Sequence, residues 1–158
     1  MPKKIEIRKC KYSHCKHDTN VIDIEKDDYV EENNKYYHSD CKHEKDVRSE
    51  IIDYWYKNID ADVIFNQFVR ILDRLLYSEH LDCDYVLFAL KKKAKYLKHP
   101  PGLVYAVKDK EVKKEWDFKK KLEEFNKAKI EVIKNEEPSF TYNDNNSKKK
   151  FGDIFGGN

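Results

Sequence analysis

The 158-residue chain contains only four glycines and four prolines. Because glycine and proline interrupt helices, their scarcity leaves long stretches free to be helical. The glycine-rich loops that cradle phosphate groups are missing from the sequence, and so is the Gly-x-Ser-x-Gly pattern of many hydrolases. The sequence therefore predicts a mainly helical protein that is not an enzyme.

Long apolar runs are missing as well. No segment approaches the roughly 20 apolar residues of a membrane span, and the basic start has no apolar stretch of the kind found in secretion signals. We therefore expect a cytoplasmic protein with no membrane partner. Cysteines stay reduced in that compartment, and clustered cysteines there indicate metal ligands before disulfides.

Three of the four cysteines lie close together in the sequence, beside a histidine. Cys10 and Cys15 are followed, after a gap of 22 residues, by His38 and Cys41. Zinc prefers four thiolate or imidazole ligands in a tetrahedron, and two close pairs supply them. The spacing predicts one structural Zn²⁺ at these four residues, since four protein ligands leave no open position for catalysis.

The choice of ligands stays open at this stage, because His14, His17 and His43 flank the two pairs. The fourth cysteine, Cys83, lies far along the chain and is expected to be a small buried group, not a fifth ligand.

The residues between the two pairs indicate how the ligands are held. "NVIDI" is typical of a strand, and "YVEENNKYYH" is typical of a hairpin that turns at Asn33-Asn34. A helix is expected to begin near Cys41. The expected order is a knuckle that supplies Cys10 and Cys15, a hairpin that ends at His38, and then the helix. This order predicts a treble-clef-like zinc finger over residues 1–45.

"KYYHSDC" resembles the second ligand pair of LIM-type zinc fingers, in which an aromatic residue precedes His-x2-Cys. Residues 1–45 are also similar to fingers in small proteins of phages and mobile elements from AT-rich, Gram-positive-type genomes. The chain departs from LIM domains in its wider Cys-x4-Cys pair and in having no second ligand set. The resemblance implies protein docking and, for a phage protein, a location in the host cytoplasm.

Residues 46–135 are expected to form a helical bundle. Apolar residues there recur every three or four positions, which is the spacing of helices with one buried face. The pattern predicts helices over 44–58, 60–80 and 83–98, the second capped by Asp60 or Asp62 and the third by Asp84. After "HPPG", residues 102–109 are typical of a short helix or strand.

A long amphipathic helix is expected over 109–135. Phe118, Leu122, Phe125 and Val132 form its apolar stripe, which is broader than a coiled-coil seam once neighbouring residues are added. Such a stripe packs either on the helical body or on a second chain. A dimer through residues 109–135 is therefore one expectation, although the sequence does not fix the oligomeric state.

Charge is distributed unevenly. Residues 91–135 carry 15 basic and 7 acidic groups. The residues expected to contact phosphates are Lys91, Lys92, Lys93, Lys95 and Lys98. The alternative is an ordinary lysine-coated surface helix, because the arginine, asparagine and glutamine side chains that favour base contacts are missing there.

The last segment, 136–158, is polar and rich in turn-forming residues, so a flexible tail is expected. It ends in "FGDIFGG". Phe151, Ile154 and Phe155 are candidates for a motif that inserts into a partner's pocket, or for a terminus that covers the protein's own core.

Two functions follow from these features. The first is a non-catalytic zinc-containing regulator associated with nucleic acid, such as a DNA-binding or replication or transcription accessory protein. The second is a protein-binding inhibitor or adaptor of a host factor, such as an anti-defence protein of a phage.

Overall fold

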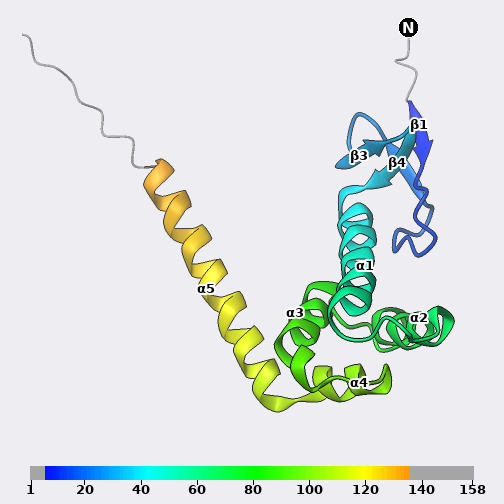
Figure 1. Ribbon diagram of the computed structural model, residues 1–158. Helices are drawn as coiled ribbons and strands as arrows, with labels where there is room; N and C mark the ends of the chain where they lie inside the picture. The colour runs from blue at the N-terminus through cyan, green and yellow to red at the C-terminus, as the bar shows by residue number, and fades with distance from the viewer. Residues whose placement is uncertain (1–5, 136–158) are drawn as a thin grey trace, which may run out of the picture. The chain divides into compact units, whose positions relative to one another are not determined.

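The computed structural model describes residues 6–135, of which 6–130 have described side chains. This part of the chain is mainly helical and begins with two short antiparallel hairpins, which confirms the predicted fold class (Figure 1). The chain divides into two compact units, 1–120 and 121–158. The predicted tail, including Phe151, Ile154 and Phe155, lies outside the described residues.

The two hairpins form the N-terminal finger, residues 6–38. Strand β1 (Ile7–Lys9) pairs with β2 (Val21–Asp23), and β3 (Tyr29–Glu32) pairs with β4 (Lys35–His38). Asn33 and Asn34, between β3 and β4, have φ angles of 51° and 59°. Asparagine tolerates this left-handed conformation, which a two-residue hairpin turn requires. The predicted turn is confirmed.

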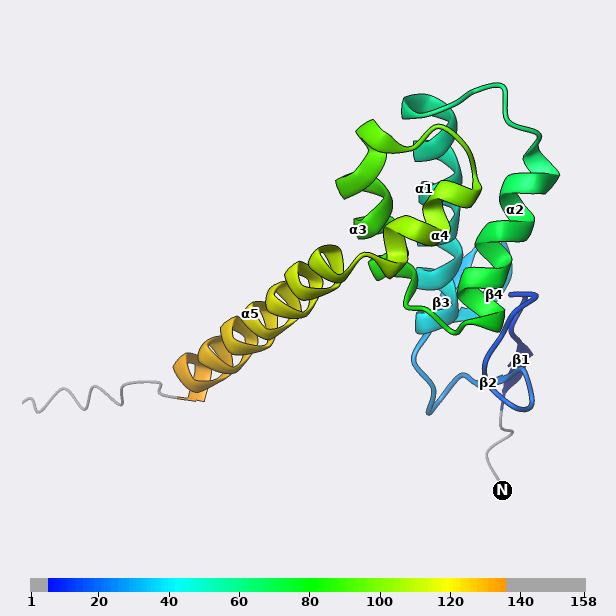
Figure 2. The ribbon, with the colours of Figure 1, turned by 90° about the horizontal axis from the view of Figure 1, so that it is seen from below.

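Helix α1 (Ser39–Asn58) follows β4 without a linker, so the finger and the helical body share one continuous element. Its buried face carries Val47, Ile51 and Trp55. The body consists of α1, α2 (Phe65–Asp73), α3 (Cys83–Lys93) and α4 (Pro101–Lys108). Figure 2 shows α2, α3 and α4 gathered around α1. The aromatic centre of this core pairs Trp55 with Phe68, whose ring centroids are 4.6 Å apart.

The second predicted helix begins later than the sequence suggested. Asp60 does not cap a helix, because its Oδ1 accepts the backbone N–H of Asp62 at 2.9 Å and closes a local turn. Such side-chain turns compete with helix formation. Helix α2 therefore starts at Phe65, and the preceding residue Ile64 is 62 % exposed. The helix continues into a π-helical turn, Arg74–Ser78 (η1).

The third helix is capped by a different residue from the one predicted. Asp82, and not Asp84, is the N-cap of α3, and its Oδ1 accepts the backbone N–H of Asp84 at 2.9 Å. Regular α-helix ends at Lys93 and tightens into a 3₁₀ turn, Ala94–Tyr96 (η2).

Helix α5 (Lys110–Asn135) begins in the first unit and continues into the second. Asp109 caps its start by accepting the backbone N–H of Glu111 at 2.9 Å. Its buried residues within the first unit are Val112 and Trp116. The predicted stripe residues Phe118, Leu122 and Phe125 are 70 %, 50 % and 65 % exposed, and the side chain of Val132 lies outside the described part.

None of the helices within residues 6–135 is both long enough and apolar enough to cross a membrane.

Substitutions at Leu72 and Ile64 test which residues form the core. Leu72 is fully buried, whereas Ile64, at the start of the same helix, is largely exposed. Leu72→Ala should lower the free energy of unfolding by about 2–5 kcal/mol, since it leaves a cavity. Ile64→Ala should change it by less than about 1 kcal/mol. Urea unfolding of both variants measures the difference, and equal effects would contradict the assigned core.

Candidate metal centre

The four predicted ligands converge in the finger. Four donor atoms lie within 4.8 Å of one another, namely the thiol sulfurs of Cys10, Cys15 and Cys41 and a ring nitrogen of His38. Cys10, His38 and Cys41 are buried, and Cys15 is partly exposed. Three thiols and one imidazole gathered in this way could hold one metal ion.

The spacing of the donor atoms fits a tetrahedral ion. Metal–sulfur and metal–nitrogen distances of about 2.3 and 2.0 Å place tetrahedral donors about 3.5–3.8 Å apart. The sulfurs of Cys15 and Cys41 are 3.7 Å apart, and the Cys15 sulfur lies 3.5 Å from His38 Nδ1. The distance from Cys41 Sγ to His38 Nδ1 is 4.0 Å. An ion of zinc size fits among them with little movement.

Backbone hydrogen bonds hold the knuckle against the hairpins. The Cys10 N–H donates to the Asn20 carbonyl at 2.8 Å, and the Lys11 N–H donates to the Tyr36 carbonyl at 2.9 Å. A tight turn places the Cys15 N–H 3.3 Å from the Tyr12 carbonyl. Cys10 and Cys15 are therefore positioned by main-chain contacts that do not require a metal.

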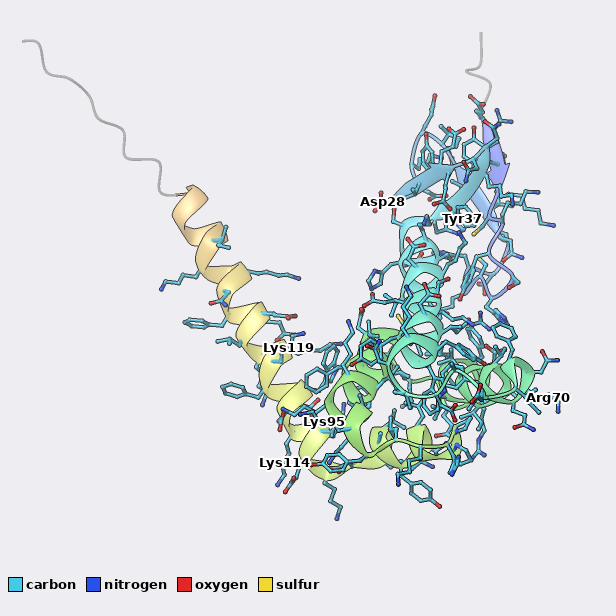
Figure 3. All side chains as sticks on the ribbon, viewed as in Figure 1. Asp28, Tyr37, Arg70, Lys95, Lys114 and Lys119 are labelled. Atoms are coloured by element: carbon cyan, nitrogen blue, oxygen red, sulfur yellow. The ribbon has the colours of Figure 1, made fainter. Side chains whose placement is uncertain are left out.

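The second pair of ligands is positioned by the junction between β4 and α1. His38 is the last residue of β4 and the N-cap of α1, and Cys41 lies in the first turn of that helix. Tyr37, which lies where β4 passes into α1, is buried beside them (Figure 3). His38 Nε2 donates to the Val21 carbonyl at 3.1 Å, which leaves Nδ1 as the acceptor facing the thiols.

His17 and Asp40 form a second layer around the ligands. The His17 ring stacks on the His38 ring with centroids 3.7 Å apart, and its Nε2 lies 3.1 Å from Asp40 Oδ1. His17, Asp40 and Cys41 also have donor atoms within 4.8 Å of one another. Burial alone would raise the pKa of Asp40, but its hydrogen bonds to His17 and to the Cys41 amide lower it.

Burial raises the pKa of the Cys15 and Cys41 thiols above the ordinary value for cysteine. The two thiols are therefore protonated at neutral pH when no cation is present. A metal ion has to displace these protons, so metal affinity must rise with pH.

The finger is tied to the helical body by a buried polar cluster. The Tyr12 hydroxyl lies 2.6 Å from the Tyr77 hydroxyl on η1 and donates to Glu44 Oε1 on α1 at 3.2 Å. Lys16 forms an ion pair with Glu44 Oε2. The Glu44 residue is only 7 % exposed. His14 stacks on Tyr77 with ring centroids 3.7 Å apart. Tyr12 and Lys16 flank the ligand Cys15, so metal binding and packing of the body involve the same short loop.

The five predicted phosphate-contacting lysines do not form one free track. Lys91, Lys92 and Lys93 on α3 form ion pairs with Glu50, Glu115 and Asp109 at 2.6, 2.6 and 2.7 Å respectively. Lys95 and Lys98 follow on η2 and the next loop, and within the described residues they have no carboxylate partner. Lys95, Lys114 and Lys119 lie around the start of α5 (Figure 3).

The structure also brings together residues that the sequence did not connect. His43 Nε2, on α1, lies 2.7 Å from Asp84 Oδ2, on α3, and Cys83 is beside them. Cys83 is buried, as expected. The sequence held no signal for this group, because His43 and Asp84 are 41 positions apart.

Comparison of the chain with protein-family models, curated proteins and solved structures finds no significant match. No family is identified, and the resemblance to LIM-type fingers rests on the sequence and spacing of the candidate ligands alone.

Cys41 is the sharpest test of the centre, because it is both a proposed ligand and part of α1. Cys41→Ser should remove one equivalent of zinc and lower the melting temperature, since the remaining ligands no longer close the tetrahedron. Metal analysis and thermal unfolding measure both effects. Zinc content and melting temperature unchanged from the wild type would contradict the assignment.

Proposed function

We propose that this protein is a non-catalytic, zinc-stabilised binding protein whose helix α5 docks on a protein partner. The observation that carries the proposal is the exposed apolar stripe of α5. It has the character of an interaction surface, because large apolar side chains that gather on one face of a helix are seldom left in water.

The exposed large apolar side chains of α5 in the second unit are those of Leu122, Phe125 and Ile130, which are 50 %, 65 % and 53 % exposed. Leu122 and Phe125 are three positions apart and so lie on one face of the helix. Within the first unit, Phe118 of the same helix is 70 % exposed. Helices of this length gain most of their stability from packing an apolar face, and a partner groove would supply that packing.

The charges beside the stripe indicate the chemistry of the partner. Residues 119–130 contain five lysines and two glutamates. A basic amphipathic helix is complementary to an apolar groove with an acidic rim, which is the helix-in-groove mode of recognition. The proposed partner is therefore a protein that presents such a groove.

In this proposal the metal is a structural Zn²⁺ held by Cys10, Cys15, His38 and Cys41. Four protein ligands close the coordination sphere, so the ion fixes the finger and takes no part in a reaction. It also sets the direction of α1, because His38 and Cys41 lie on either side of the start of that helix. The finger then stabilises the body from which α5 begins.

Nucleic-acid binding is the second candidate, and one observation favours it. Lys95, Lys98, Lys110 and Lys114 have no carboxylate partner within the described residues, so they can contact phosphates without breaking an ion pair. Lys91, Lys92 and Lys93 would first have to leave theirs. Surface ion pairs are weak, so this cost is small. The four unpaired lysines are the better candidates.

The docking proposal is tested by replacing Phe125 with a photo-crosslinking amino acid in the full chain, in the cells that produce it. We expect a discrete adduct with one protein, at least about tenfold stronger than the adduct from the same amino acid at Lys127, which is exposed on another face. An adduct with the mass of two chains would identify the partner as a second copy. Leu122→Asp should abolish the adduct.

No adduct at Phe125, or equal labelling at Phe125 and Lys127, would contradict the docking proposal.

The nucleic-acid candidate is tested with fluorescent duplex and single-stranded DNA at salt concentrations from about 50 to 200 mM. Four phosphate contacts predict a log–log salt slope of about −3 to −4. Changing Lys95, Lys98, Lys110 and Lys114 to Ala should weaken binding far more than changing Lys91 and Lys92. Absence of binding at the lowest salt would reject this candidate.

A further inference from the structure

A cavity of about 360 Å³ lies between the start of α1 and the start of α3. Its lining includes Cys41, His43 and Glu44 from α1, His80 from the segment before α3, and Cys83 and Asp84 from the first turn of α3. Nitrogen, sulfur and oxygen donors thus surround one space. None of the contacts described above for the finger uses His43, Cys83 or Asp84.

Three of these donors are close enough to share one ion. The donor atoms of His43, Cys83 and Asp84 lie within 4.8 Å of one another. Cys83 is only 9 % exposed, and its sulfur accepts a hydrogen bond from the backbone N–H of Asp84. This buried thiol lines the cavity beside an imidazole and a carboxylate, so three different donor types meet there.

We propose that His43, Cys83 and Asp84 bind a second divalent ion of the zinc class. Zinc accepts imidazole nitrogen, thiolate sulfur and carboxylate oxygen together. Three protein ligands leave a fourth position open toward the cavity, where water or a small anion binds. The first centre is closed by four protein ligands, so the two ions would differ in their exchange with solvent.

The surrounding charges favour a cation. Asp40, Glu44 and Asp82 also line the cavity and add negative charge close to the three donors. The lining has one ammonium group, that of Lys16, which forms an ion pair with Glu44. His80 supplies a further imidazole at the cavity wall.

A thiol, an imidazole and a carboxylate could instead form a nucleophilic group, but the protonation states oppose it. Burial beside Asp84 and Asp82 raises the pKa of the Cys83 thiol to about 11. A buried thiol that keeps its proton at neutral pH is not an activated nucleophile.

Binding of this ion would join two elements of the body. His43 lies on α1, two residues after the zinc ligand Cys41, and Cys83 and Asp84 form the first turn of α3. An ion held by both helices would therefore fasten α3 to α1 and stabilise the body independently of any partner of α5.

The test is the metal content of the full chain after saturation with zinc at pH 8 and removal of free ion. The wild type should hold two equivalents. Cys83→Ala, His43→Gln and Asp84→Asn should each hold one, with the second zinc bound at least about tenfold more weakly. His99→Gln, which changes a histidine outside this cavity, should keep two.

A second readout covers the risk that Cys83→Ala fails to fold. Cobalt added to protein that already holds one zinc should give the charge-transfer absorption of a cobalt–thiolate bond, and Asp84→Asn, at a partly exposed position, should weaken cobalt binding. One equivalent in the saturated wild type, or two equivalents in all three variants, would overturn the proposal.

Discussion

The convergence of Cys10, Cys15, His38 and Cys41 is the constraint on which the finger depends. Its buried cluster also contains Tyr12, Ile22 and Tyr37, and the partly buried Ile24, Tyr29 and Tyr36 pack against it. So small a core contributes little against the conformational entropy lost when the finger is ordered. The proposed metal ion would add to this core, because it would join loop, strand and helix at one point. The two asparagines of the β3–β4 turn set the register that delivers His38 to that point.

Helix α1 connects the finger to the hydrophobic core of the helical body. One helix bears the candidate ligand Cys41, the buried Glu44 that accepts a hydrogen bond from Tyr12, and the core residues Val47, Ile51 and Trp55. Tyr12 reaches the body through Tyr77, so the finger is attached both by the chain and by side chains. The body in turn fixes the beginning of α5 through Val112 and Trp116. A partner of α5 would therefore engage a helix whose first turns are anchored to the helical body.

The sequence was most informative where local chemistry decides the structure. Ligand spacing identified Cys10, Cys15, His38 and Cys41, and the asparagine pair located the hairpin turn. The predicted start of α2 was wrong. Apolar spacing alone placed it at Asp60, but the Asp60 side chain closes a local turn that competes with helix formation. The ion pairs of Lys91, Lys92 and Lys93, and the approach of His43 to Asp84, could not be predicted. They depend on how separate helices pack, which no spacing along the chain records.

The 3.7 Å separation of the Cys15 and Cys41 sulfurs has a consequence for redox chemistry. Without a metal these thiols are close enough to be joined, after a small shift, to a disulfide bond of about 2.05 Å, if an oxidant accepts two electrons and two protons leave. The resulting bond would remove two of the four candidate ligands, so the proposed zinc could not bind until a reductant restored the thiols. Zinc binding and thiol oxidation would therefore compete for the same two sulfur atoms.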